Sequence, residues 1–260
     1  MTGEAAPDRK VFRITGKDRE TFLQGLVTND LARLKIGLVY AALLSPQGKY
    51  LADFFLVPAH DAVLLDVRES LADSLQRRLA MYRLRADVQI APVDAHVSRG
   101  LGPTPVGAFP DPRDPHLGWR LYSDTAGGPP SIDWDAIRVA HCIPETGIEL
   151  IPDDTYILEA GFERLSGVDF RKGCYVGQEI TARMKHKTEL RKGLATVAVT
   201  GAAPVGTEIT ADRKPAGVLF SQSGGRGIAW LRFDRAGGQM RAGGALLTLS
   251  EPALTATPQG

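Results

Sequence analysis

The sequence predicts an α+β protein that ends in a small β-barrel. Over residues 39–90, three apolar strand-like segments, one helical segment and a further strand follow one another. This order predicts an antiparallel sheet with a helix on one face. From Gly193 onward, five short segments with β-branched residues alternate with glycine-rich turns, a pattern typical of a barrel.

The elements of the first part follow from the spacing of apolar residues. Apolar side chains recur at three- and four-residue steps over residues 17–34, which predicts one helix. The turn residues 45–48 (Ser-Pro-Gln-Gly) predict a hairpin. Ser70 and Asp73 have the spacing of a capping box, which predicts the start of a second helix. The strands expected here are 11–15, 39–44, 50–57, 62–67 and 88–90.

The rest of the chain divides into a loop region, a helix and the barrel. Residues 100–130 are rich in proline and glycine, which predicts a loop with at most one short strand at 118–122. A helix is expected from Ser131 to Cys142, because Pro144 ends it. The barrel strands expected are 194–200, 208–211, 217–221, 227–233 and 245–249.

Composition excludes several classes of function. The formal net charge is +1, so no global attraction for nucleic acid is expected. No apolar run approaches the roughly 18 residues that a membrane-spanning helix needs. The N-terminal residues lack the features of a secretory signal or a transit peptide, and the two cysteines lie far apart in sequence. We therefore expect a cytoplasmic protein that binds neither nucleic acid nor membrane.

The chemistry of the chain centres on Cys174, which lies between Gly173 and Gly177. Glycines permit tight turns and close approach of the backbone. Positive charge from Arg171 and Lys172 stabilises a thiolate, and a helix that begins just after Gly177 would add to this effect. A buried residue in a tight turn is the other interpretation of a lone cysteine. For Cys142, we expect packing.

The segment from Lys172 to Glu179 (KGCYVGQE) resembles the signature of the YgfZ-type folate-binding proteins, which assist iron–sulfur cluster assembly. Further matches to this family occur at residues 22–30, 44–49 and 181–184. The wider superfamily includes the T-protein of the glycine cleavage system, an aminomethyltransferase that uses tetrahydrofolate. The resemblance implies a T-protein-like folate-binding portion over residues 1–192, with an approximately ferredoxin-like part at 46–92. A barrel domain follows at 193–260.

The resemblance also implies a binding site for tetrahydrofolate or a derivative in the N-terminal portion. Glu159 is the best match to the carboxylate that accepts two hydrogen bonds from the pteridine. The other expected folate contacts are Asn29, Asp30, Lys172, Tyr175, Gln178, Glu179 and Arg183. For residues 28–30 (Thr-Asn-Asp), a turn that interrupts the helix is an equal alternative. A run of basic residues from Arg171 to Lys192, which includes Lys187, suits the anionic tail of a folate or is a solvated segment.

The implied function is that of a folate-binding accessory protein in the assembly or repair of 4Fe–4S clusters. Cys174 is the thiol expected to act. Because a cluster normally needs four thiolates, a cluster held by Cys174 would be shared transiently with a partner, either an A-type carrier or a client protein. Redox chemistry or thiol exchange is the other role open to Cys174. We expect an assembly factor rather than an enzyme.

The alternative function is a folate-dependent aminomethyl or one-carbon transferase. The T-protein has two adjacent acids where this chain has Ala52 and Asp53. Adjacent residues of a strand point to opposite faces, so Asp53 cannot replace the missing acid. The sequence therefore disfavours aminomethyl transfer.

Overall fold

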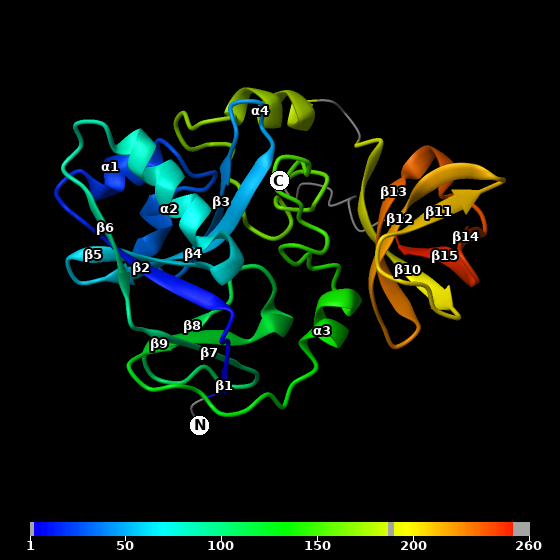
Figure 1. The fold of residues 1–260 in the computed structure, drawn as a ribbon, viewed down its shortest axis with the longest axis horizontal. Coiled ribbons are helices and arrows are strands. Elements are labelled where there is room, and N and C mark those ends of the chain that lie inside the picture. Colours follow the sequence, from blue (N-terminus) through cyan, green and yellow to red (C-terminus); the bar gives the residue numbers. More distant parts are fainter. Residues whose placement is uncertain (1–2, 187–189, 252–260) are drawn as a thin grey trace. The chain divides into compact units, whose positions relative to one another are not determined.

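The computed structural model describes residues 3–186 and 190–251 (Figure 1). The chain forms two compact units, and each unit is built from two separate stretches of sequence. Unit 1 comprises Met1–Ile132 and Leu165–Gln178, and unit 2 comprises Asp133–Arg164 and Glu179–Gly260. The domain boundary expected between residues 192 and 193 stays a prediction.

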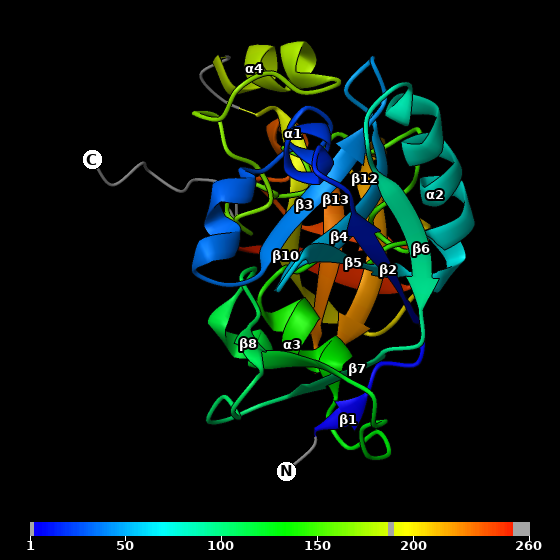
Figure 2. The same cartoon turned by 90° about the vertical axis from the view of Figure 1, so that its left-hand side faces the viewer.

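The main sheet of unit 1 is antiparallel, with the strand order β3-β4-β5-β2-β6. Helix α2 (Glu69–Arg83) runs along one face of it (Figure 2). The predicted sheet with one helix is confirmed, and so is the hairpin turn at 45–48, where Gly48 has a φ of +73°. The strands are β2 (Arg9–Thr15), β3 (Val39–Leu44), β4 (Tyr50–Ala59), β5 (Ala62–Arg68) and β6 (Gln89–Val93).

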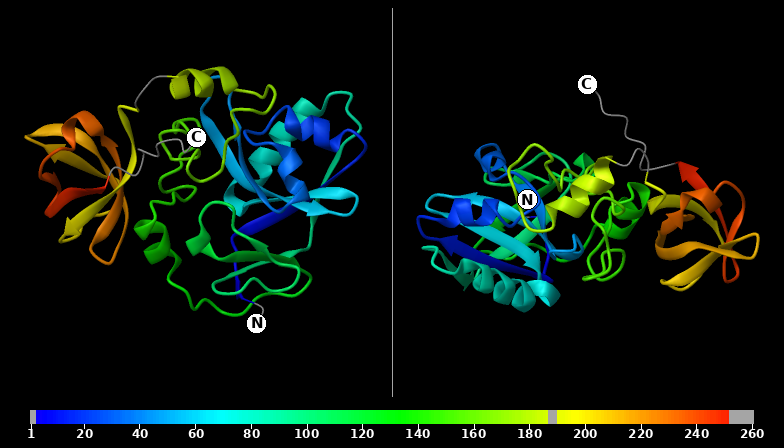
Figure 3. Two further views of the ribbon diagram at one scale, coloured as in Figure 1. Left: turned by 180° about the vertical axis from the view of Figure 1, so that it is seen from behind. Right: turned by 90° about the horizontal axis from the view of Figure 1, so that it is seen from above.

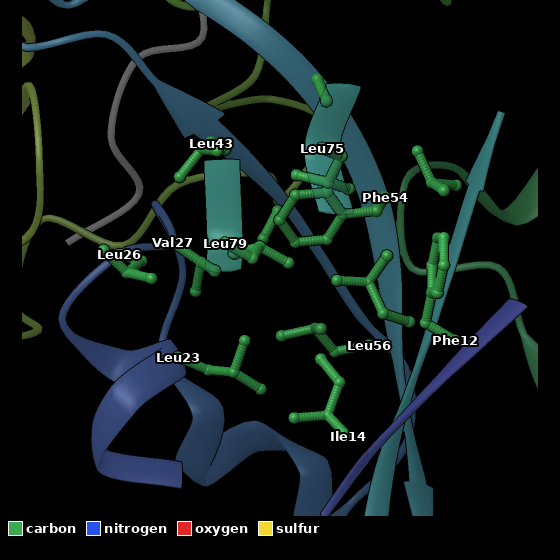
Figure 4. Close-up of a cluster of buried hydrophobic side chains, with 14 of the residues drawn as sticks. Phe12, Ile14, Leu23, Leu26, Val27, Leu43, Phe54, Leu56, Leu75 and Leu79 are labelled. Carbon is green, nitrogen blue, oxygen red and sulfur yellow. The ribbon is translucent and has the colours of Figure 1, made fainter. Parts of the chain in front are cut away.

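The core of unit 1 fills the space between this sheet and its helices. Leu75 and Leu79 of α2 point toward Phe54 and Leu56 of β4, and all four side chains are buried (Figure 4). The predicted capping box is wrong, because α2 begins at Glu69 without a side-chain cap. The apolar stripe alone is sufficient to place this helix.

The helix predicted over residues 17–34 is wrong in its length. It consists of α1 (Arg19–Gln24) and a separate 3₁₀ helix, η1 (Leu31–Lys35). Between them, the side chains of Thr28 and Asn29 form hydrogen bonds to distant backbone groups. Short polar side chains that bind backbone in this way compete with helical hydrogen bonds. The turn interpretation of residues 28–30 is therefore correct for the local structure.

Unit 1 contains a second sheet that the sequence did not reveal, with the strand order β1-β7-β9-β8. Only β9 (Trp119–Ser123) was expected in the proline-rich region. The other strands, β1 (Glu4–Ala5), β7 (His96–Gly100) and β8 (Phe109–Pro110), are short or irregular in pattern, and η2 (Pro115–Leu117) precedes β9. Periodicity is a weak signal in segments of two to five residues.

A buried charge network, formed by Arg9, Asp66, Arg120 and Tyr122, joins the two sheets of unit 1. The Asp66 carboxylate accepts hydrogen bonds from Arg9 Nε at 2.6 Å, Arg120 at 2.7 Å and the Tyr122 hydroxyl at 2.8 Å. The guanidinium of Arg120 also lies 4.2 Å from the centroid of the Phe55 ring. Asp66 is fully buried, so its charge depends on these partners.

Unit 2 contains the closed barrel, with the strand order β10-β13-β12-β11-β14-β15 (Figure 3). The predicted barrel is confirmed, and β14 is a strand that the sequence did not predict. The strands are β10 (Lys192–Thr200), β11 (Thr207–Ala211), β12 (Lys214–Ser223), β13 (Arg226–Arg232), β14 (Met240–Ala242) and β15 (Ala245–Glu251), with η3 (Phe233–Arg235) between β13 and β14.

Two helices complete the chain. Helix α3 (Trp134–Ala140) is shorter than expected, because the residues before Trp134 do not enter it. Arg138 of α3 is buried and donates to Ile143 O and to Ser221 Oγ of β12, which fixes the helix within unit 2. Helix α4 (Gln178–His186) follows the Cys174 segment. Among the described residues, no helix has the length and apolarity needed to cross a membrane.

Candidate functional site

Cys174 lies on a loop that we call the thiol loop, residues 169–178 of unit 1. The cysteine is exposed. Its loop is held on both sides of the cysteine, by Lys172 at one end and by Gly177 at the other. The result is an accessible sulfur on a backbone that the rest of unit 1 fixes in place.

Lys172 anchors the first half of the thiol loop to the end of helix α1. Its Nζ donates to Gln24 O at 2.7 Å and to Val27 O, and it lies 5.0 Å from the centroid of the Tyr175 ring. Burial lowers the pKa of Lys172 to about 8, although the carboxylates of Asp30 and Asp169 act in the opposite direction. The side chain therefore works as a structural tie that satisfies one backbone carbonyl of the last helical residue and one just beyond the helix.

Gly177 anchors the second half of the loop to the β3–β4 hairpin. Its φ is +81°, and a Cβ at this position would lie 2.5 Å from Ser45 O and 3.0 Å from Leu44 Cβ. The expected close approach is thus confirmed at Gly177. At Gly173, φ is outside the left-handed region and a Cβ would meet no protein atom within 4 Å, so a close approach to a ligand there stays a prediction.

The expected helix after Gly177 is confirmed, because α4 begins at Gln178. The Gln178 side chain accepts a hydrogen bond from the Tyr175 backbone N–H at 3.0 Å, which closes the turn after the cysteine. Glu179 and Arg183 are exposed on α4 and belong to unit 2, one helical turn apart. Lys187, part of the expected basic run, lies outside the described residues.

Thr28 and Asn29 form a clamp between strand β3 and the segment that precedes the thiol loop. Asn29 is 3% exposed, and its amide donates to Tyr40 O at 2.8 Å and Ser166 O at 2.7 Å. Thr28 Oγ1 donates to Gly167 O at 2.7 Å. Both donor hydrogens of the Asn29 amide are therefore used within the protein.

Asp30 continues this clamp on the other side of Asn29. Its carboxylate accepts from Ala32 N and from Gln24 Nε2, so it caps η1. A folate contact of either residue stays a prediction.

Glu159, the expected pteridine ligand, lies in unit 2 and is 7% exposed. Its Oε2 accepts from Trp230 Nε1 at 3.4 Å, and its Oε1 lies 3.5 Å from Lys192 Nζ. Lys192 also lies 5.0 Å from the centroid of the Trp230 ring. Sequence reasoning missed Trp230, because it reaches Glu159 only through the folding of strand β13 beside β10.

Asp53 lies in a polar environment that the sequence did not reveal. Its carboxylate accepts from Tyr50 at 2.6 Å and Tyr40 at 3.0 Å. Burial and the charge of Asp53 raise the pKa of Tyr40, so this hydroxyl is a hydrogen-bond donor at neutral pH. Ala52 instead packs in the apolar core. The expectation that the two residues occupy opposite faces of β4 is confirmed.

The two cysteines differ as the sequence predicts, and their reaction with an alkylating reagent should differ accordingly. Cys142 is 3% exposed, and burial raises the pKa of its thiol to about 11. Cys174 is exposed. Because the accessible thiolate is the nucleophile, iodoacetamide should modify Cys174 well before Cys142 in the native protein. Mass spectrometry over time measures this order, and equal rates would contradict it.

Comparison with known proteins gives the chain a family context. Residues 191–256 match the family described as CAF17, C-terminal beta-barrel domain. The human protein named iron-sulfur cluster assembly factor IBA57, mitochondrial, is 31% identical over 89% of this chain and 78% of its own length. Its mouse counterpart is 30% identical over 87% and 76%. The Mycosarcoma maydis homolog is 32% identical, and the matched region spans 72% of this chain but only 54% of that relative.

A solved structure has the same fold. It is the glycine cleavage system aminomethyltransferase T from Bartonella henselae, with a TM-score of 0.73 and 16% identity over 97% of this chain and 87% of the other. The expected T-protein-like fold with a C-terminal barrel is therefore confirmed. The expected cytoplasmic location is contradicted, because the relatives above are named as mitochondrial proteins.

Proposed function

Because the chain belongs to the family of the iron–sulfur cluster assembly factor IBA57, we propose that it acts in iron–sulfur cluster assembly through Cys174. The observation that carries this proposal is an exposed thiol on a loop that Lys172 and Gly177 hold in place. Within the wider group, the resemblance of residues 172–179 to the YgfZ-type signature supports a role in the assembly or repair of 4Fe–4S clusters.

The chemistry of Cys174 suits an iron–sulfur cluster that the protein passes on and does not keep as its own cofactor. A thiolate is a soft ligand for iron, but a cluster takes about four such ligands. Cys142 is buried, so Cys174 is the one accessible thiol of this chain. A cluster at Cys174 would therefore be shared with a partner, an A-type carrier or a client protein, that supplies the remaining ligands. An exposed loop with a fixed backbone suits such a shared site, because the sulfur reaches a second protein without reorganisation.

A genetic complementation experiment tests this function. In cells that lack the gene, the wild-type chain should restore the activity of enzymes that contain 4Fe–4S clusters, whereas Cys174→Ala should not. Cys142→Ala is the matched control and should restore activity like the wild type, provided both variants accumulate equally. Full rescue by Cys174→Ala would exclude this thiol as the acting group.

We also propose that the protein binds tetrahydrofolate or a derivative. The T-protein-like fold supports this. Glu159 is the residue that the resemblance assigns as pteridine ligand, and a carboxylate suits this role because its two oxygens accept two parallel hydrogen bonds. The side-chain amide of Asn29 already donates both of its hydrogens to backbone carbonyls.

Calorimetry with tetrahydrofolate tests this binding. The wild-type chain should bind it in preference to NAD or ATP, and Glu159→Ala should weaken binding by about 1.5–3 kcal/mol, the value of a hydrogen bond to a charged group. Asp154→Ala, which removes an exposed carboxylate from the preceding turn, serves as the control. No heat at millimolar ligand, or equal binding by Glu159→Ala, would count against the proposal.

The observations do not favour aminomethyl transfer as a second function. General acid–base catalysis needs a carboxylate within hydrogen-bond reach of the amine. The position that carries the first acid in the T-protein is Ala52, whose side chain is in the apolar core. Asp53 lies on the other face of the strand, where Tyr40 and Tyr50 hold it.

A further inference from the structure

Helix α2 has an apolar surface at its C-terminal end that nothing in unit 1 covers. Its core face, with Leu75 and Leu79, is buried against the sheet (Figure 4). In the last turn, Met81 and Tyr82 are 66% and 36% exposed, and Leu84 just beyond it is 87% exposed. Scattered exposed apolar residues are normal, but three within four positions of one helix end are a feature to explain.

The same helix end is positively charged. Between residues 73 and 87 the chain has four arginines and two aspartates, namely Arg77, Arg78, Arg83, Arg85, Asp73 and Asp87. Within 3–186 and 190–251, Arg77 and Arg85 have no ion-pair partner. Residues four apart on a helix are neighbours, so Arg77 lies beside Met81. Exposed charge and exposed apolar surface thus adjoin each other.

The backbone of Leu84, the residue that follows α2, has an unusual conformation. Its φ is +45° and its ψ is −109°, a conformation that residues with a Cβ rarely adopt. Its exposed side chain gains nothing from the core that would offset this cost. Strained residues of this kind cluster at binding sites and switches.

We propose that the α2-end surface, defined by Arg77, Met81, Tyr82, Leu84 and Arg85, binds an acidic segment of a partner protein that also carries apolar side chains. Arginine and tyrosine are enriched among the residues that dominate interface energies. Methionine adapts its shape to a bound surface. The unpaired arginines select an acidic partner, because complementary charge gives specificity and fast association.

A membrane surface fits this region less well. A helix that lies in a bilayer interface presents an apolar face along its length. The apolar face of α2 is buried in the core of unit 1, and only its last turn exposes large apolar side chains. The binding of an acidic segment goes beyond the proposed role of Cys174 and does not depend on it.

Fluorescence anisotropy with the full chain tests this proposal. The probes are labelled synthetic peptides in which glutamate and leucine are placed at helical spacings, in a small panel with different leucine positions. The wild-type chain should bind at least one peptide. The double variant Arg77→Glu with Arg85→Glu should weaken binding by about tenfold, which corresponds to a loss of about 1.4 kcal/mol. The matched control, Arg226→Glu with Arg241→Glu, reverses two exposed barrel charges and should bind like the wild type.

A second variant separates binding from folding. Glycine adopts a positive φ without a steric cost, so Leu84→Gly should keep or raise the thermal midpoint while it weakens peptide binding severalfold. The proposal is overturned if no peptide binds the wild type at millimolar concentration, or if the variants bind as well as the wild type. It is also overturned if phosphatidylserine vesicles, rather than the peptides, bind in a way that depends on these residues.

Discussion

Asp66→Ala is expected to lower the free energy of unfolding by about 3–5 kcal/mol, the cost of breaking a buried ion pair by removing one partner. The substitution leaves Arg120, which is 4% exposed, without its closest carboxylate, and it removes the acceptor for the Tyr122 hydroxyl. A typical protein of this kind is stable by only about 5–15 kcal/mol. Urea unfolding at neutral pH, followed by circular dichroism, measures the change.

The matched control for this prediction is Asp61→Ala. Asp61 also forms an ion pair, with Arg13, but both side chains are largely exposed. Exposed pairs contribute little to stability, so this variant should unfold close to the wild-type midpoint. If both variants unfold at the same urea concentration, the buried charge network does not hold the two sheets together.

The same network makes stability depend on pH. Burial opposes ionisation of Asp66, but the charges of Arg9 and Arg120 outweigh it and lower the pKa of this carboxyl. A carboxyl whose pKa is lower in the folded state stabilises the fold above its unfolded value of about 3.9, and this stabilisation is lost as the pH falls through the folded value. Wild-type stability should therefore decrease below about pH 4. The decrease should be smaller in Asp66→Asn.

Gly177→Ala is expected to displace the thiol loop and to abolish most of the cluster-assembly activity in the complementation assay. A methyl group there would lie 2.5 Å from a backbone oxygen of the β3–β4 hairpin, and alanine would have to adopt a φ of +81°. Together, the strained backbone and the overpacking cost about 2–6 kcal/mol. Limited proteolysis should cleave the loop of the variant sooner than that of the wild type.

Gly173→Ala is the matched control, because it adds the same methyl group one residue before Cys174. That methyl group would meet no atom within 4 Å. This variant should keep the activity and the protease resistance of the wild type. Equal loss in both variants would mean that the loop needs flexibility on either side of the cysteine and is not fixed by Gly177.

The local pattern of the sequence was sufficient for elements whose neighbours in sequence are also their neighbours in space. The β3–β4 hairpin is one, because its turn chemistry and its apolar strands are contiguous. The position of Cys174 between a basic pair and a helix start is another. The motif alone could not show that Gly177 touches the hairpin whereas Gly173 faces open space. The contact at Gly177 is with Ser45, which is far away in the sequence.

The errors arose where a distant partner decides the local structure. Residues 17–34 have helical periodicity, but Thr28 and Asn29 donate to the backbone carbonyls of residues 166 and 167, and these bonds keep residues 28 and 29 out of a helix. The tyrosine pair at Asp53 and the tryptophan at Glu159 likewise depend on strand pairing. The location was misjudged for a different reason, since the composition of the first residues does not determine a compartment, and the relatives are named as mitochondrial proteins.

The clamp of Thr28 and Asn29 has a consequence for the folding of the chain during its synthesis on the ribosome. Thr28 meets Gly167 across a separation of 139 residues. While the strands of unit 1 are being synthesised, Thr28 therefore lacks this partner. The hydrogen bond forms only after Gly167 has been translated. Closing so long a loop costs entropy that the later contacts must offset. The thiol loop follows directly in the sequence, so its contacts to the end of α1 and to the β3–β4 hairpin form only after residues 172–177 have been synthesised.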